Sequence, residues 1–232
     1  MKWIVILLVV IVAGAIGSYW YEGYSAESKL LTQPVYRVLR KHEPVVFDKL
    51  VDEYKLYLRE ETRRESYVNL ANTEITLVAT HSLAHASQDS VLALMRDMVA
   101  TAHRLQQLPG DACFRYWFPQ VSGPPDIAKY IDEAAQSHTL DLMGEVIRTS
   151  NETPSPLPSS DAETKAVKDN LASVINATYQ QYGADAQMIA HTDDAGTDRT
   201  KVCAITISVY ERILSLPPAE SGALLRAMTQ IR

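Results

Sequence analysis

Apolar positions recur at three- and four-residue steps along most of the chain, which is the period of an amphipathic helix. The first such segment begins near Val46 and continues through the charged stretch REETRRE at residues 59–65. Further segments with this period cover residues 67–86, 91–108, 125–134, 137–148, 162–182 and 200–215, and a last helix ends at Arg232. The pattern therefore predicts an all-α protein.

Prolines and small polar residues mark the ends of these helices. Pro34 and Pro44 stand where a first helical turn tolerates proline, and SQDS at 87–90 is typical of a turn and an N-cap. One segment leaves a choice, because VCAITISVY at 202–210 is rich in β-branched residues and is long enough for a strand. We favour a helix there, since ERIL at 211–214 continues the helical pattern.

The amino terminus predicts a membrane anchor. The run from Trp3 to Gly17 is uninterrupted and apolar, and Trp3–Tyr21 as a helix would span about 28 Å, enough for a bilayer core. Tyr and Trp at its end are typical of a membrane interface, and Lys2 favours a cytoplasmic amino end. We therefore expect residues 1–22 to form a single-pass transmembrane helix of the inner (cell) membrane, with residues 3–21 in the lipid bilayer and the rest of the chain in the periplasm.

A cleaved signal peptide is the alternative to this anchor. A cationic start and an apolar run fit it, and Ala15 and Gly17 form a weak small-x-small cleavage site. Cleavage there would leave SYWYEGY as the mature start, and no better site follows. The flanking residues therefore favour the uncleaved anchor, and either interpretation places the remaining chain outside the cytoplasm.

Beyond the anchor, the sequence predicts a tether and one helical domain. Residues 23–33 are the polar tether, and residues 34–232 form the exported domain. TSNETPSPLPSSD at 149–161 holds three prolines and four serines and is expected to be a surface linker. Cys113 and Cys203 are an even pair in an oxidising compartment, which predicts one disulfide; two buried free thiols are the alternative.

Charge argues against nucleic acid as a partner. The formal net charge is -6, and the densest cationic runs are interleaved with glutamates. A phosphate backbone requires Lys and Arg that are not neutralised in this way.

The segment CFRYWFP is the main candidate for a partner-binding site. It carries Phe114, Arg115, Tyr116, Trp117 and Phe118, which are residue types enriched at protein-binding hot spots. We expect it to be a rigid loop between the cysteine and a proline, and a rigid loop loses less entropy on binding. The competing interpretation is that these aromatics fill the core between helices, as most clustered aromatics do.

Two motifs raise the question of a metal. His81 and His85 are four residues apart and would lie on one face of a helix, but the HExxH pattern is absent and no third ligand is evident. HTDDAGTD at 191–198 is rich in carboxylates, yet Val202 stands where an EF-hand needs glutamate. We expect no metal and no cofactor.

Nucleophile and nucleotide-binding motifs are missing, so catalysis has little support. The leading hypothesis is a membrane-anchored, protein-binding protein, in one concrete form an immunity protein that neutralises a basic toxin in the periplasm. An acidic surface would suit a basic partner. A scaffold or assembly factor of an envelope secretion, pilus or division complex fits the same features. A membrane-tethered metal-dependent hydrolase that uses His81 and His85 is the enzymatic alternative.

Overall fold

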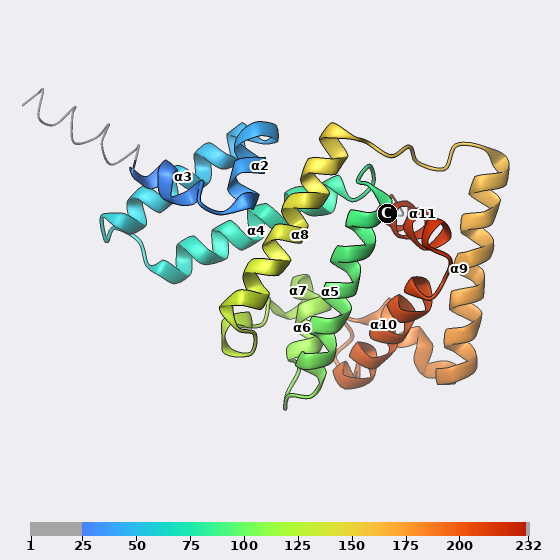
Figure 1. Ribbon diagram of the computed structural model, residues 1–232. Helices are drawn as coiled ribbons and strands as arrows, with labels where there is room; N and C mark the ends of the chain where they lie inside the picture. The colour runs from blue at the N-terminus through green and yellow to red at the C-terminus, as the bar shows by residue number, and fades with distance from the viewer. Residues whose placement is uncertain (1–24, 231–232) are drawn as a thin grey trace, which may run out of the picture. The chain divides into compact units, whose positions relative to one another are not determined.

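The computed structural model describes residues 25–230, and over this range the chain is helical and contains no strand (Figure 1). The prediction of an all-α fold is confirmed. Contacts divide the chain between Val78 and Ala79 into two compact units, where the sequence analysis expected one domain over 34–232. We call residues 25–78 unit 1 and residues 79–232 unit 2, and we describe each by itself.

The predicted anchor at residues 1–22 lies outside the described residues. Within residues 25–230, no helix combines the length and the apolarity needed to cross a membrane.

Unit 1 is built from α2 (Pro34–His42), α3 (Pro44–Leu58) and the first part of α4 (Arg64–Ser82). Both prolines begin their helices as predicted. The tether prediction needs correction, because residues 25–30 are helical and Ala26 and Leu30 are buried. The segment contributes only a few apolar side chains, too few for its helical period to be seen in the sequence.

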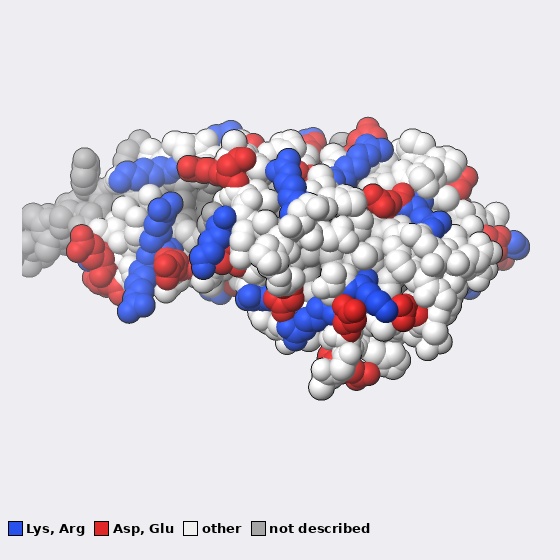
Figure 2. All heavy atoms as spheres, turned by 90° about the horizontal axis from the view of Figure 1, so that it is seen from below, with Lys and Arg blue, Asp and Glu red and all other residues white. Residues whose placement is uncertain are grey.

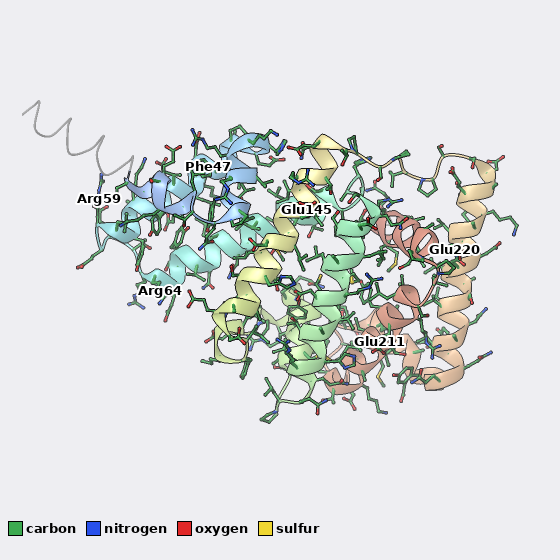
Figure 3. The ribbon with its side chains drawn as sticks, in the orientation of Figure 1. Phe47, Arg59, Arg64, Glu145, Glu211 and Glu220 are labelled. Atoms are coloured by element: carbon green, nitrogen blue, oxygen red, sulfur yellow. A yellow bond between two sulfur atoms is a disulfide. The ribbon has the colours of Figure 1, made fainter. Side chains whose placement is uncertain are left out.

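The helix α3 ends at Leu58, not within the charged stretch that follows. Glu60 adopts a left-handed backbone with φ 61°. Its N–H donates to the Tyr57 carbonyl over 3.0 Å, and the N–H of Glu61 donates to the Leu56 carbonyl over 2.9 Å. These two bonds form a Schellman motif, which satisfies the last carbonyls of the helix. Arg59 and Arg64 mark the ends of this turn (Figure 3).

Four tyrosines gather in unit 1. The hydroxyls of Tyr36 and Tyr67 are hydrogen-bonded at 2.9 Å, and the Tyr67 ring lies 5.0 Å from the Tyr54 ring and 6.2 Å from the Tyr57 ring. Burial raises the pKa of Tyr67, and the hydroxyl of Tyr36 raises it further. The pair satisfies two polar groups that would otherwise be buried without partners.

Unit 2 is arranged around α5 (Gln88–Gln106), which contacts four of its neighbours: α6 (Ala112–Trp117), α8 (Glu133–Glu152), α10 (Arg199–Leu214) and α11 (Pro218–Met228). The remaining elements are α7 (Pro119–Ser122), the 3-10 helices η1 (Ile127–Lys129) and η2 (Gly183–His191), and α9 (Asp161–Tyr182). α9 packs on α10 and α11.

Exposed side chains also link these helices. Glu211 of α10 is hydrogen-bonded to His103 of α5 at 2.8 Å, and Glu220 of α11 accepts from Asn170 of α9 over 3.0 Å (Figure 3).

Two clusters of buried apolar side chains meet along α5. The first surrounds its amino-terminal half and includes Ala86, Val91, Leu92, Leu94, Met95, Val146, Val174, Ile213, Leu224 and Leu225. The second surrounds its carboxy-terminal half and includes Val99, Ala102, Leu105, Ala112, Cys113, Cys203 and Ile207. α5 therefore contributes to both ends of the core of unit 2.

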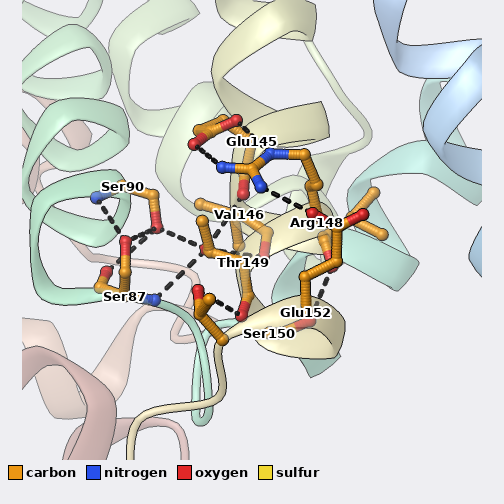
Figure 4. Close-up of polar contacts among 10 residues, drawn as sticks. Ser87, Ser90, Glu145, Val146, Arg148, Thr149, Ser150 and Glu152 are labelled. Atoms are coloured by element: carbon orange, nitrogen blue, oxygen red, sulfur yellow. Dashed lines mark hydrogen bonds and ion pairs between the residues drawn. The ribbon is translucent and has the colours of Figure 1, made fainter.

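The amino end of α5 is held by hydroxyl groups (Figure 4). Ser87 is the N-cap, as predicted, and accepts from the N–H of Ser90 over 3.3 Å. The hydroxyl of Thr149 accepts from the N–H of Ser87 over 3.2 Å and lies 2.9 Å from the Ser90 hydroxyl. Three hydroxyls thus connect α8 to the first turn of α5 and satisfy one another inside the fold.

The role of Thr149 corrects the predicted linker at 149–161. Residues 149–152 belong to α8, and the irregular segment runs from Thr153 to Ser160. It is tied back to unit 2, because the N–H of Ser155 donates to the His85 carbonyl over 2.8 Å. Ser160 then begins α9 with a capping box that Glu163 completes.

Residues 125–134 also depart from the expected helix. Only residues 127–129 form a 3-10 turn, and α8 begins at Glu133. The side chain of Asp132 accepts from the N–H of Ala135 over 2.8 Å and so fixes the start of α8. The segment at 202–210 is helical within α10, as favoured from the sequence.

Cys113 of α6 and Cys203 of α10 lie at disulfide distance, with Cα atoms 5.8 Å apart. Both are buried in the second apolar cluster. The pair therefore joins two elements that are separated by 90 residues in the chain.

Replacing both cysteines by alanine should lower the free energy of unfolding by about 4 kcal/mol, because the bridge restricts a long loop in the unfolded chain. Urea denaturation of the wild type and of the double variant measures the difference. Alkylation under non-reducing conditions provides the check on the bond, since quantitative labelling of both thiols in protein isolated from an oxidising compartment would show that it does not form.

Candidate functional site

The aromatic segment is helical, not the loop expected from the sequence. Residues 112–117 form α6, and Pro119 begins the short α7 directly after it. The chain continues in a helix because Cys113 and its apolar neighbours pack as one buried face against α5 and α10. Pro119 follows the end of α6 and is the first residue of α7.

Phe114 has no exposed surface. Its ring lies 5.2 Å from that of Phe118, and the guanidinium of Arg199 stands 5.0 Å over it. Arg199 also forms an ion pair with Asp111. A cation over an aromatic face is attracted by the ring quadrupole, so the start of α10 covers the ring on this side.

Arg115 holds the turn after α7 and does not project from the surface as an anchor. Its Nε donates to the Gly123 carbonyl over 3.1 Å, and its Nη2 donates to the Pro124 carbonyl over 2.5 Å. Gly123 has φ +72°, a conformation that favours glycine. The two bonds satisfy backbone carbonyls in a segment without regular structure.

Tyr116 and Trp117 lie side by side, with ring centroids 5.6 Å apart. Trp117 stacks on Tyr210 of α10 at 4.8 Å and contacts both apolar clusters. Burial raises the pKa of Tyr116, and the nearby carboxylate of Asp97 raises it further, while a hydrogen bond with Thr101 acts in the opposite direction. These rings bridge the two halves of the core.

The five residues predicted as a partner-binding site thus all make contacts with other residues of unit 2. Phe114 is fully buried and the other four are half-buried, so their contacts favour the core interpretation that the sequence left open. Partner binding by the other four stays a prediction. The sequence could not decide between core and interface because it does not show which elements cover α6.

The histidine pair does not form one stripe. α4 ends at Ser82, so His81 is on the helix while His85 lies in the following turn, and both are exposed. Glu74, seven residues before His81 on α4, forms an ion pair with Lys49 at 2.7 Å. The metal-binding geometry that depended on a continuous helix is therefore lost.

The carboxylates at 191–198 have ordinary structural roles. Asp198 is the N-cap of α10 and accepts from the N–H groups of Thr200 and Lys201, both over 3.1 Å. Asp194 lies 3.7 Å from the His191 ring. Among the residues that the structure describes, no group of three or more His, Cys, Asp or Glu side chains is placed to hold a metal ion.

A different surface, which sequence reasoning missed, lies on α9. Residues 170–184 contain no Asp, Glu, Lys, Arg or His. Ile175 and Tyr179 are 44% and 42% exposed, and Ala172 is exposed one turn before them. We call these three residues the α9 stripe. They are spaced at i, i+3 and i+7, so they lie on one face of the helix.

Charged pairs stand beyond both ends of the charge-free segment. Lys165 pairs with Asp169 at 2.5 Å, and Asp185 pairs with Lys201 at 2.8 Å. An uncharged centre with Tyr and an aliphatic residue, bordered by charged groups, is the usual composition of a protein-binding surface. The signal available from the sequence was the absence of charge over four turns of an exposed helix.

Unit 2 carries the negative net charge of the protein, and residues 1–78 carry none. Residues 79–232 carry 18 Asp and Glu against 12 Lys and Arg, whereas residues 1–78 carry 10 of each. On the face in Figure 2, basic and acidic side chains are interspersed, and no continuous basic area is present there. The excess of acid would favour a cationic partner for unit 2.

Comparisons of the chain with protein-family models, with curated proteins and with solved structures find no match.

Trp117→Ala should lower the free energy of unfolding by about 3 kcal/mol, because it removes a large ring from between the two apolar clusters. Trp117→Phe keeps most of the contact with Tyr210 and should cost less than half as much. Urea denaturation followed by circular dichroism measures both. An alanine variant as stable as the wild type would contradict the core role of Trp117.

Proposed function

We propose that the chain is a membrane-anchored protein without catalysis that binds another protein at the periplasmic face of the cell membrane. The observation that carries the proposal is the α9 stripe, an exposed and uncharged surface on a helix whose other side packs on α10 and α11. Exposed apolar side chains at i, i+3 and i+7 are the spacing by which a helix docks into a groove.

The anchor supports this proposal through geometry. A bilayer-length segment at Trp3–Tyr21 would hold the units at the membrane surface, where an exported partner arrives. Restriction to that surface raises the effective concentration of the chain for such a partner. No part of this argument requires a catalytic group.

Within this class we propose an immunity protein that neutralises a basic toxin delivered to the periplasm. The formal net charge of unit 2 is -6, so long-range attraction would steer a cationic protein toward it. The α9 stripe would supply the uncharged centre of the contact. A scaffold of an envelope complex would use the same surface, and the identity of the captured partner distinguishes the two roles.

The hydrolase alternative has no comparable support. His81 and His85 lie on different elements, and the described residues place no third ligand beside them.

A photoreactive amino acid at position 179, in the full-length chain in its own host, should cross-link to a cationic exported protein. The same group at Ser173, which is exposed on another side of α9, is the matched control and should not. Ile175→Asp should abolish the cross-link, since a carboxylate at the centre of the contact would be desolvated without a partner. Its thermal unfolding should stay close to that of the wild type, because the position is on the surface.

Equal cross-linking from positions 179 and 173, or a cross-link that survives Ile175→Asp, would contradict the proposed surface. Immunity further requires that cells producing the Ile175→Asp chain lose protection against the captured toxin. Capture of an envelope-complex subunit in its place would support the scaffold role and reject immunity.

A further inference from the structure

Arg226 of α11 is buried and has no anionic partner among residues 25–230. The residue is 8% exposed, and neither Nε nor Nη1 has a hydrogen-bond acceptor among the described residues. Arginine is rarely buried to this extent unless it is paired. Its guanidinium keeps its charge at neutral pH even in an apolar site, so the group cannot escape the cost of burial by losing a proton.

A second unsatisfied polar group lies on the same helix. Ser221 is 1% exposed, and its hydroxyl has no partner among the described residues. A buried hydroxyl normally finds an acceptor or a donor. α11 therefore carries both an unused hydroxyl and an unused guanidinium on its buried side.

Gly222 brings the first residue of α5 close to this guanidinium. A Cβ at Gly222 would stand 2.6 Å from Cγ of Gln88 and 3.5 Å from Nη1 of Arg226. A glycine weakens the interior of a helix, and here its missing side chain leaves space that Gln88 and Arg226 share. Gln88 opens α5, a helix of 19 residues, whose amino end carries partial positive charge.

Two groups of positive character thus lie on either side of Gly222: the guanidinium of Arg226 and the amino end of α5, whose first turn also carries the exposed carboxylate of Asp89. Burial lowers the pKa of Arg226, and no carboxylate counteracts this. Gln88 lies at the same point with a flexible, uncharged side chain, which an incoming group can displace.

We propose that the contact between α11 and the first turn of α5 is a binding site for an oxyanion, a carboxylate or a phosphate group, held by Arg226. The guanidinium is the side chain best suited to bind either group, because its N–H donors match the spacing of the oxygens. The site is separate from the α9 stripe and does not depend on the proposed function.

The test uses the full-length chain in mild detergent, with sodium phosphate or sodium acetate compared against sodium chloride at equal ionic strength. At least one of the two oxyanions should raise Tm above the value in chloride, increasing with concentration as for a ligand that binds the folded state. The signal of the Arg226 Nε–H in NMR spectra should shift and saturate over the same range.

Two variants assign the effect to the site. Arg226→Met should abolish the increment in Tm and should itself be more stable than the wild type in chloride, because an unpaired buried charge has been removed. Gln88→Glu supplies an internal carboxylate beside the guanidinium, so it should raise Tm in chloride by roughly 2–4 °C and abolish the increment. The gain from Gln88→Glu should be lost in the Arg226→Met background, which separates pairing from a general effect of acid at a helix start.

Arg212→Met is the matched control. Arg212 also has a buried Nε without an acceptor, but its Nη2 is bonded to Gln181, and its loss should leave the increment unchanged. If neither oxyanion raises Tm above chloride, or if the rise persists in Arg226→Met, the proposal is overturned. A response to acetate alone identifies a carboxylate site, and a response to phosphate alone identifies a phosphate site.

Discussion

The structure of unit 2 depends on the burial of α5 on several sides at once. Its apolar residues face α8, α10 and α11 in the first cluster and α6 and α10 in the second. Burial of this kind contributes roughly 25 cal/mol per Å² of apolar surface. The hydroxyls of Ser87, Ser90 and Thr149 fix where the helix begins, and the pair Cys113–Cys203 joins two of the elements that cover it.

This arrangement explains where the molecule can interact. Trp117 of α6 packs against both clusters and Phe114 is fully buried, so the residues with the strongest binding composition contribute to stability. α9 contributes Val174 to the first cluster and packs on α10 and α11, while Ala172, Ile175 and Tyr179 stay exposed. Its exposed stripe is therefore available to a partner without disturbing the core.

The sequence was most informative where one local pattern decides the structure. The period of apolar residues located most of the helices, and Pro34 and Pro44 marked two helix starts correctly. It failed where a local interaction competes with that period: the left-handed Glu60 ends α3, and the Asp132 cap starts α8 at Glu133 where a boundary between two helices was predicted further on. Thr149 was misassigned to a linker because the stretch at 149–161 is polar in composition, although the Thr149 hydroxyl is hydrogen-bonded to Ser90 inside the fold.

For Phe114–Phe118 the sequence could not choose between core and interface, since the elements that cover these residues are distant in the chain. Arg226 gave no signal, because burial of a charged residue is not visible in a local pattern.

Hydrogen exchange of the full-length chain, followed by mass spectrometry, tests most directly whether α5 is the helix on which unit 2 depends. The account predicts that the backbone amides in peptides from residues 88–106 exchange the slowest in unit 2, through global unfolding alone. Amides in peptides from residues 161–182 should exchange faster, through local opening. Exchange in α5 as fast as in α9, under conditions where the protein is folded, would contradict it.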